Sequence, residues 1–129
     1  WRTPAARWSE SVPARGRTSL VYGGWYEDLW YAALRGGLEP AAQRRAFAQI
    51  RAFETLLARE RVRVLKLHFE VDAAAQRRHF EELRADPATR WRITPEDDWY
   101  ARHHPAVARL VRRVRVATDA PAARWRVVP

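Results

Sequence analysis

The chain has 129 residues, of which 47 % are hydrophobic, and its formal net charge is +9 at pH 7. This length is enough for one small domain or part of a larger one, and no apolar run approaches the roughly 20 residues of a membrane span. The lack of cysteine excludes disulfides and thiolate zinc sites. With no signal-peptide pattern at its start, the chain is expected to be cytoplasmic.

Nearly all the positive charge is arginine, and Lys66 is the only lysine. Arginine is the better fork for phosphate oxygens, so the chain should attract polyanions. Codon bias in a GC-rich genome explains the arginine excess equally well. The sequence begins at Trp1 rather than at methionine, so we expect it to be part of a longer protein.

The first half of the chain predicts one short strand and two helices. Residues 17–22 (RTSLVY) predict a strand that ends at Gly23-Gly24, and a helix should then run from Trp25 to about Leu34. Glu39-Pro40 opens the longest predicted helix, because proline is tolerated in a first helical turn. Apolar residues recur along it at helical spacing and predict one buried face: Ala46, Phe47, Ile50, Phe53, Leu56 and Leu57.

The stretch 62–71 is almost continuously apolar, which predicts a strand buried on both faces, as in a parallel sheet. The order strand, helix, strand indicates a βαβ unit. Asp72 is a suitable N-cap for a helix over 73–85, which Asp86-Pro87 should end.

The last third predicts two more helical segments and a closing strand. Thr94-Pro95-Glu96 should start the first of these helices, since it offers a cap, a first-turn proline and acidic residues near the helix N-terminus. A second helical segment is expected from 106 to about 116, after Pro105. Residues 125–128 (WRVV) predict the last strand.

Five sequence segments, in this order, resemble the polyphosphate kinase type 2 family. They are GRTSLVYGGWYED (Gly16–Asp28), IRAFETLL (Ile50–Leu57), VLKLHFEVDAAAQRR (Val64–Arg78), DPATRWRITPEDD (Asp86–Asp98) and TDAPAARWRVV (Thr118–Val128). The resemblance implies an α/β fold: a partial P-loop kinase-like three-layer α/β/α domain with a short parallel sheet and an arginine-rich helical lid. Residues 1–129 would form a single, incomplete domain of this family.

Two departures from the family pattern bear on catalysis. No G-x-x-x-x-G-K-[ST] loop is present, although the family cradles phosphate with such a Walker A loop. At the strand end, Tyr22 stands where the family has a metal-binding Asp, and Gly23 stands where it has a phosphate-binding Arg. This glycine-containing version is similar to the non-catalytic N-terminal domain of fused polyphosphate:AMP phosphotransferases.

Three functional hypotheses remain open. The resemblance implies a domain of a polyphosphate:AMP phosphotransferase that binds polyphosphate or nucleotide phosphates without catalysing transfer itself. Alternatively, the chain is the C-terminal lid half of an active enzyme whose P-loop lies upstream. A third hypothesis, from the charge and the seven tryptophans, is a basic nucleic-acid-binding module. Whether the chain is an enzyme therefore stays undecided at this point.

The resemblance also implies cofactors and partners. The family uses Mg²⁺, but the sequence indicates no metal site in this chain. The implied partners are inorganic polyphosphate, AMP or ADP, and a second kinase domain or further copies of the chain; a membrane is not among them. The candidate phosphate- or polyphosphate-binding residues are Lys66, Arg77, Arg78, Arg90 and Arg92.

Each candidate has a structural alternative. Lys66 is either a phosphate contact at the carboxyl side of its strand or an outward-facing charge. The helical arginines either bind polyphosphate or pair with Glu81, Glu82 and Asp86 along a solvated face. Trp91 is expected to pack, with nucleobase stacking as the alternative. The pair His103-His104 lacks a third ligand, which disfavours a metal site.

Overall fold

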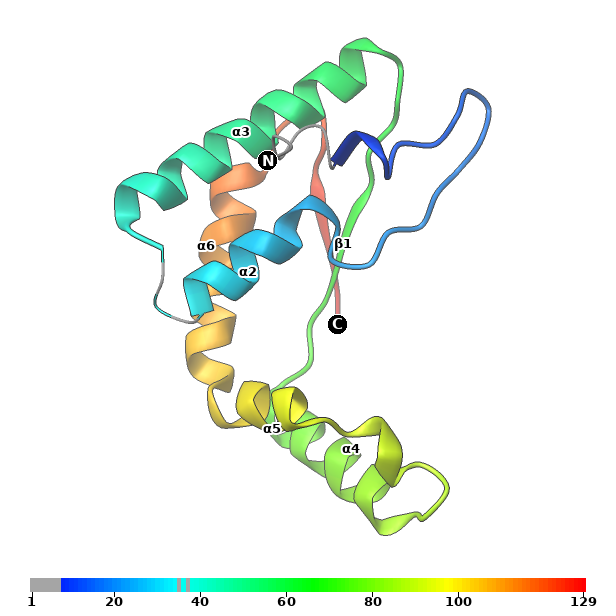
Figure 1. Cartoon of the computed structure of the whole chain (residues 1–129), viewed down its shortest axis with the longest axis vertical. Helices are drawn as coiled ribbons and strands as arrows, with labels where there is room; N and C mark the ends of the chain where they lie inside the picture. The colour runs from blue at the N-terminus through cyan, green and yellow to red at the C-terminus, as the bar shows by residue number, and fades with distance from the viewer. Residues whose placement is uncertain (1–7, 35, 37) are drawn as a thin grey trace. The chain divides into compact units, whose positions relative to one another are not determined.

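The computed structural model describes residues 8–34, 36 and 38–129, which form two compact units. The first unit comprises the residues up to Val64 together with Ala120–Ala123, and the second comprises Leu65–Asp119 and Arg124–Pro129. Both helices and a parallel sheet are present, so the predicted α/β class is confirmed (Figure 1). No helix in the described part of the chain is long and apolar enough to cross a membrane.

The first unit is built on α3 (Pro40–Arg59), the long helix that Pro40 was predicted to open. Its buried apolar residues follow helical spacing: Phe47, Ile50, Phe53 and Leu57. The short 3₁₀ turn η1 (Gly24–Tyr26) leads into α2 (Glu27–Leu34), which contacts α3. Tyr26 and Leu29 are buried, so the core of this unit comes from one face of α3 and the η1–α2 segment.

The predicted strand over 17–22 is not present. Residues 17–21 form no regular structure, and Leu20 and Tyr22 are 98 % and 99 % exposed. An extended segment becomes a strand only when a neighbour supplies hydrogen bonds, and no described residue pairs with this one. The segment ends in two residues with positive φ, Gly23 at 70° and Gly24 at 56°, a backbone that favours glycine.

The second unit contains the sheet, in which β1 (Lys66–Phe69) and β2 (Trp125–Val128) run parallel and side by side (Figure 1). Lys66 pairs with Trp125 and Phe69 with Val128. Paired residues of a parallel ladder point to the same face, so Lys66 and Trp125 share one face of this sheet. That face contacts the end of α6 (His104–Thr118), because the Lys66 Nζ and the Trp125 Nε1 both donate to Thr118.

The prediction of a strand over 62–71 buried on both faces is wrong in length and in burial. Only Lys66–Phe69 is strand, and the alternate residues Leu65, Leu67, Phe69 and Val71 are 66 %, 44 %, 67 % and 51 % exposed. Apolar composition alone indicated two covered faces. In the described chain the residues at Leu67 and Phe69 lie on the face opposite Lys66, and that face is open.

The remaining elements of the second unit are held by local caps. The helix α4 (Ala73–Ala85) has the predicted bounds, and the Asp72 carboxylate accepts from the N–H groups of Ala74 and Ala75. The 3₁₀ turn η2 (Arg90–Arg92) then leads to α5 (Pro95–Arg102), which begins with a capping box between Thr94 and Asp97. Among the described residues, α4 and α5 contact each other and α5 contacts α6.

Candidate anion-binding site

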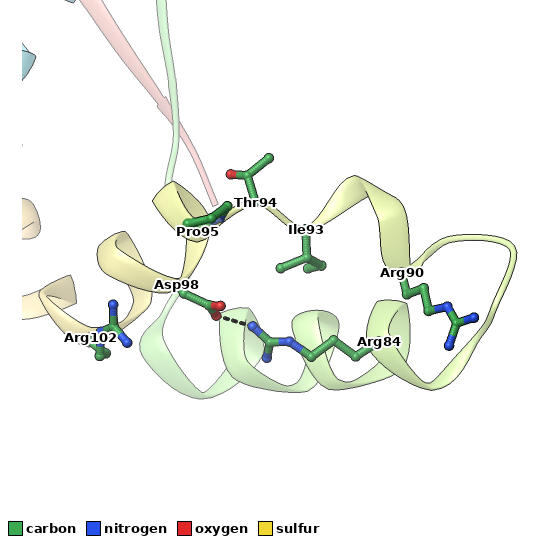
Figure 2. Close-up of a pocket in the computed structure, with 7 residues that line it drawn as sticks. All are labelled: Arg84, Arg90, Ile93, Thr94, Pro95, Asp98 and Arg102. Atoms are coloured by element: carbon green, nitrogen blue, oxygen red, sulfur yellow. Dashed lines mark hydrogen bonds and ion pairs between the residues drawn. The ribbon is translucent and has the colours of Figure 1, made fainter.

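An open cavity of about 410 Å³ lies in the second unit between α4 and the segment that runs from η2 through α5. Figure 2 shows its lining, in which Arg84 and Asp98 face each other while Arg90 and Arg102 lie toward opposite ends. Seven residues line it: Arg84, Arg90, Ile93, Thr94, Pro95, Asp98 and Arg102. Three guanidinium groups against one carboxylate make this a basic cavity that favours an anionic ligand.

Local hydrogen bonds in the backbone turns position these side chains. After α4, the Thr89 hydroxyl donates to the Leu83 carbonyl at 3.0 Å, and the Arg90 N–H donates to the Asp86 carbonyl at 2.9 Å. The Thr94 N–H donates to the Asp97 carboxylate at 2.8 Å, which closes the N-terminus of α5. The arginines therefore project from a folded helical hairpin, which consists of α4, η2 and α5, rather than from an unstructured loop.

The N-cap residue of α4, Asp72, has a lowered pKa. Hydrogen bonds from the N–H groups of Ala75 and Ala74 stabilise the charged carboxylate and lower the pKa of Asp72 below its ordinary value of 3.8. The cap is therefore fully formed at neutral pH. It fixes the start of the helix that carries Arg84 on its last turn.

Arg84 is the cavity arginine with a carboxylate partner, since its guanidinium donates to Asp98 in an ion pair. Both side chains are close to half exposed, at 45 % and 44 %. Solvent screens such a pair, so it contributes little to folding and a multivalent anion can compete with Asp98 for Arg84. Neither Arg90 nor Arg102 forms an ion pair with any described residue.

The predicted site residues are only partly brought together. Arg90 lines the cavity, whereas Arg77, Arg78 and Arg92 are exposed and do not. Within the described part of the chain these three form no ion pair, so the alternative of pairing with Glu81, Glu82 and Asp86 is not seen. Their binding of phosphate stays a prediction.

Arg102 was missed. It stands on the last turn of α5, and only the folding of α5 back along α4 places it beside the cavity that Arg84 lines. The capping motif at Thr94 predicted the helix, but no sequence signal gave its direction relative to α4. Arg84 was likewise not among the candidate phosphate-binding residues, although it also lines the cavity.

Lys66 lies in a different environment from either interpretation of the sequence. It is 5 % exposed, its Nζ donates to the Thr118 carbonyl at 2.8 Å, and it lies 5.0 Å from the centroid of the Trp125 ring. An outward-facing charge is therefore wrong. Lys66 is also the first residue of β1, at the amino end of the strand, whereas ligands of open α/β sheets bind beyond the carboxyl ends. Phosphate binding by Lys66 stays a prediction without support from these contacts.

Trp91 does not pack, contrary to expectation. Its side chain is 76 % exposed on η2, between Arg90 and Arg92, and its Nε1 donates to the Ala88 carbonyl at 2.8 Å. The ring is exposed although η2 itself contacts α4. This exposed tryptophan adjoins a residue of the cavity, Arg90.

The described residues do not fit a magnesium site. No three His, Asp or Glu side chains among them come close enough to hold a metal ion. At the position where the resemblance implies a metal-binding Asp, Tyr22 offers a phenol, a poor ligand for this hard cation. His103 and His104 instead contact backbone carbonyls, those of Trp99 and Val71.

Comparison with known proteins places this arrangement in context. Residues 5–129 match the family described as polyphosphate kinase 2. A polyphosphate:AMP phosphotransferase of Pseudomonas aeruginosa is 27 % identical over 127 residues, which cover 98 % of this chain and 26 % of the relative. A GDP-polyphosphate phosphotransferase of Mycobacterium tuberculosis is 28 % identical over 122 residues, covering 95 % of this chain and 41 % of the relative.

A solved structure has the same fold. The crystal structure of polyphosphate kinase 2 from Arthrobacter aurescens superposes with a TM-score of 0.94 at 22 % sequence identity, covering 99 % of this chain and 45 % of that one. This chain therefore spans between about a quarter and under half of the length of these relatives.

Proposed function

The chain belongs to the polyphosphate kinase 2 family, and from this premise we propose that it is the anion-binding part of a polyphosphate:nucleotide phosphotransferase. In this proposal the chain binds inorganic polyphosphate or nucleotide phosphates and does not transfer phosphoryl groups by itself. A second kinase domain or another copy of the chain would complete the enzyme.

One observation carries the proposal: the cavity between α4 and α5 holds three arginines and a single carboxylate. Guanidinium groups bind phosphate oxygens in a bidentate manner, and a chain of linked phosphates can engage several of them at once. Arg90 and Arg102 lack carboxylate partners among the described residues, so binding an anion there displaces no ion pair of theirs.

The lack of catalysis is supported by the residues at the strand-end motif. Phosphoryl transfer depends on preorganised cations around the transferred group, supplied in P-loop enzymes by a lysine-bearing loop and a metal-holding carboxylate. The printed sequence has no such loop, and Tyr22 and Gly23 stand where the resemblance to the family implies a metal-binding carboxylate and a phosphate-binding arginine. Gly23 adopts a φ of 70°, so an arginine in its place would be strained.

Binding is tested by titrating the chain with tripolyphosphate in a calorimeter at low salt. We expect the double variant Arg90→Ala/Arg102→Ala to bind at least about tenfold more weakly, because two charge-assisted contacts are lost. The control is Arg44→Ala/Arg45→Ala, which removes the same charge from exposed positions on α3. Equal weakening in both variants would show that net charge, not the cavity, binds the anion.

Catalysis is tested by incubating the chain with Mg²⁺, polyphosphate and AMP or ADP. We expect no phosphoryl transfer, whereas tripolyphosphate binding is retained. Transfer above the rate without protein would show that the chain is itself a phosphotransferase and that residues within it replace the Walker loop.

A further inference from the structure

Trp91 combines three properties that packing residues do not share. Its side chain is 76 % exposed, its one polar atom is satisfied by the Ala88 carbonyl at 2.8 Å, and no described ring or cation stacks on it. An exposed indole offers a large flat surface on which an aromatic ligand can stack. The hydrogen bond fixes the edge of the indole and leaves its faces available.

The ring is held by an ordered turn. The Ala88 N–H donates to the Asp86 carboxylate at 2.8 Å, and the Thr89 and Arg90 N–H groups both donate to the Asp86 carbonyl. The Arg92 N–H then donates to the Thr89 carbonyl at 2.9 Å. Trp91 is therefore held by a preformed turn, which lowers the entropy cost of stacking a ligand on its ring.

The charges around the ring specify the ligand further. Arg90 and Arg92 flank Trp91, both are exposed, and neither forms an ion pair with a described residue. Arg90 also lines the arginine cavity. A ligand that fits such a surface has a flat aromatic part and a phosphate separated from it by a short linker, which is the chemistry of a nucleotide.

We propose that Trp91 is a stacking platform for the nucleobase of a mononucleotide whose phosphate lies toward Arg90. This inference rests on the proposed function. It adds a side chain, Trp91, that distinguishes a nucleotide from inorganic polyphosphate. Inorganic polyphosphate presents only phosphates to the cavity, whereas a nucleotide gains the stacking contact as well.

A mononucleotide fits better than single-stranded nucleic acid. Proteins that bind single strands stack successive bases on several aromatic side chains. The second Arg-Trp-Arg segment offers no such platform, because Trp125 is partly buried, donates to the Thr118 hydroxyl at 3.0 Å and lies under the Lys66 ammonium. Among the tryptophans described in the second unit, Trp91 is exposed, whereas Trp99 and Trp125 are partly buried and Trp99 stacks on the His103 ring.

The test labels the seven tryptophans of the chain with 5-fluorotryptophan and follows them by ¹⁹F NMR. Trp91→Phe assigns the signal of Trp91, and the other signals serve as internal controls. We expect AMP to shift the Trp91 signal in a saturable manner through the ring current of the purine. Ribose 5-phosphate and tripolyphosphate should leave that signal nearly unchanged while they bind.

Affinity provides the second readout. We expect Trp91→Leu to weaken AMP binding by about tenfold and to leave tripolyphosphate binding within about twofold, since one stacked base is lost and no charge is removed. Trp91→Phe should retain part of the AMP affinity. Val116→Ala removes another exposed apolar side chain, on α6, and should change neither affinity.

The outcomes separate the two proposals. If tripolyphosphate binds but AMP leaves the Trp91 signal unshifted, the platform is wrong and the proposed function stands. If neither anion binds, both are wrong. A shift of equal size with ribose 5-phosphate, or an oligodeoxythymidylate that binds more than about a hundredfold more tightly than AMP, would also overturn the mononucleotide assignment.

Discussion

The cluster around Glu54 in the first unit and the arginine hairpin in the second use charged side chains in opposite ways. Glu54 is fully buried and accepts from the Trp25 Nε1 at 3.1 Å and from the Tyr26 hydroxyl at 2.7 Å. Phe53, its neighbour on α3, contacts the rings of Trp8 and Trp25 at centroid distances of 5.3 Å and 5.2 Å. By contrast, α4, η2 and α5 contain no buried residue at all.

This difference indicates which region uses its polar side chains for folding and which leaves them available to a ligand. A buried carboxylate needs every donor it has, because an unpaired polar group away from water is costly, so the Glu54 cluster is committed to folding. The guanidinium groups of the hairpin are hydrated and mostly unpaired among the described residues, so they remain available to a ligand. Substitutions of two buried charged side chains, Glu54 and Lys66, and of two charged residues of the hairpin region, Asp72 and Arg84, test this contrast from the largest expected effect to the smallest.

Glu54→Ala should destabilise the chain most. It removes the acceptor of the Trp25 and Tyr26 donors and leaves a cavity beside Phe53, and we expect the free energy of unfolding to fall by about 2–5 kcal/mol. Urea unfolding followed by tryptophan fluorescence measures the change. Glu54→Gln keeps a side-chain oxygen and should lose less, and the exposed neighbour Thr55→Ala should stay within about 0.5 kcal/mol. A tolerated Glu54→Ala would contradict a structural role for this glutamate.

Lys66→Met should come second. Methionine has nearly the same shape as the methylene stem of lysine, but the Thr118 carbonyl loses its donor and the Trp125 ring loses its cation. We expect the free energy of unfolding to fall by about 1–3 kcal/mol. Thermal unfolding by circular dichroism measures the loss. Lys66→Arg is the control that retains the charge. If the methionine variant is as stable as the wild type and loses tripolyphosphate binding, Lys66 is a ligand contact rather than a structural one.

Acid should weaken the hairpin through the α4 cap. Because the pKa of Asp72 lies below 3.8 in the folded chain, its cap stabilises the fold above about that pH, and the contribution is lost as the pH falls through the folded-state pKa. Asp72→Asn caps the helix without titrating. We therefore expect the variant to lose less helical ellipticity than the wild type between pH 5 and pH 2.5. Parallel curves would exclude Asp72 as the titrating group.

Arg84→Ala should have the smallest effect on stability. The Arg84–Asp98 pair is nearly half exposed, so its loss should change the free energy of unfolding by about 0–1 kcal/mol. A double-mutant cycle with Asp98→Asn measures the pair itself. The same Arg84→Ala variant should weaken tripolyphosphate binding. A loss above about 2 kcal/mol would mean that the hairpin, like the Glu54 cluster, depends on its charges for folding.

The parts of the fold that could be predicted are those that neighbouring residues determine. Asp72 and Thr94 start α4 and α5 as expected, because a side-chain oxygen and the N–H groups it accepts from lie within three residues. The strand over 17–22 could not be judged in this way. A strand exists only with a hydrogen-bonding neighbour, and the described chain supplies none there.

The sequence predicted that the site contains arginines, but it did not predict which residues line the cavity. Arg90 could be selected from a basic segment, but Arg102 joins the cavity only because α5 folds back along α4. The same limit applies to Lys66 and Trp91. A lysine among apolar residues indicates neither the Thr118 carbonyl that receives it nor the Trp125 ring beside it, and a tryptophan gives no sign of whether another element will cover it.

The burial of Lys66 has a practical consequence, since the chain has a single lysine and therefore a single ε-amine. In the folded chain this amine is shielded beneath the end of α6, so acylating reagents can reach it only when the contact between β1 and α6 opens. The rate at which a small ester acylates this amine therefore reports how often the second unit opens locally. Because every other side-chain cation is arginine or histidine, mass spectrometry can follow this acylation at one position.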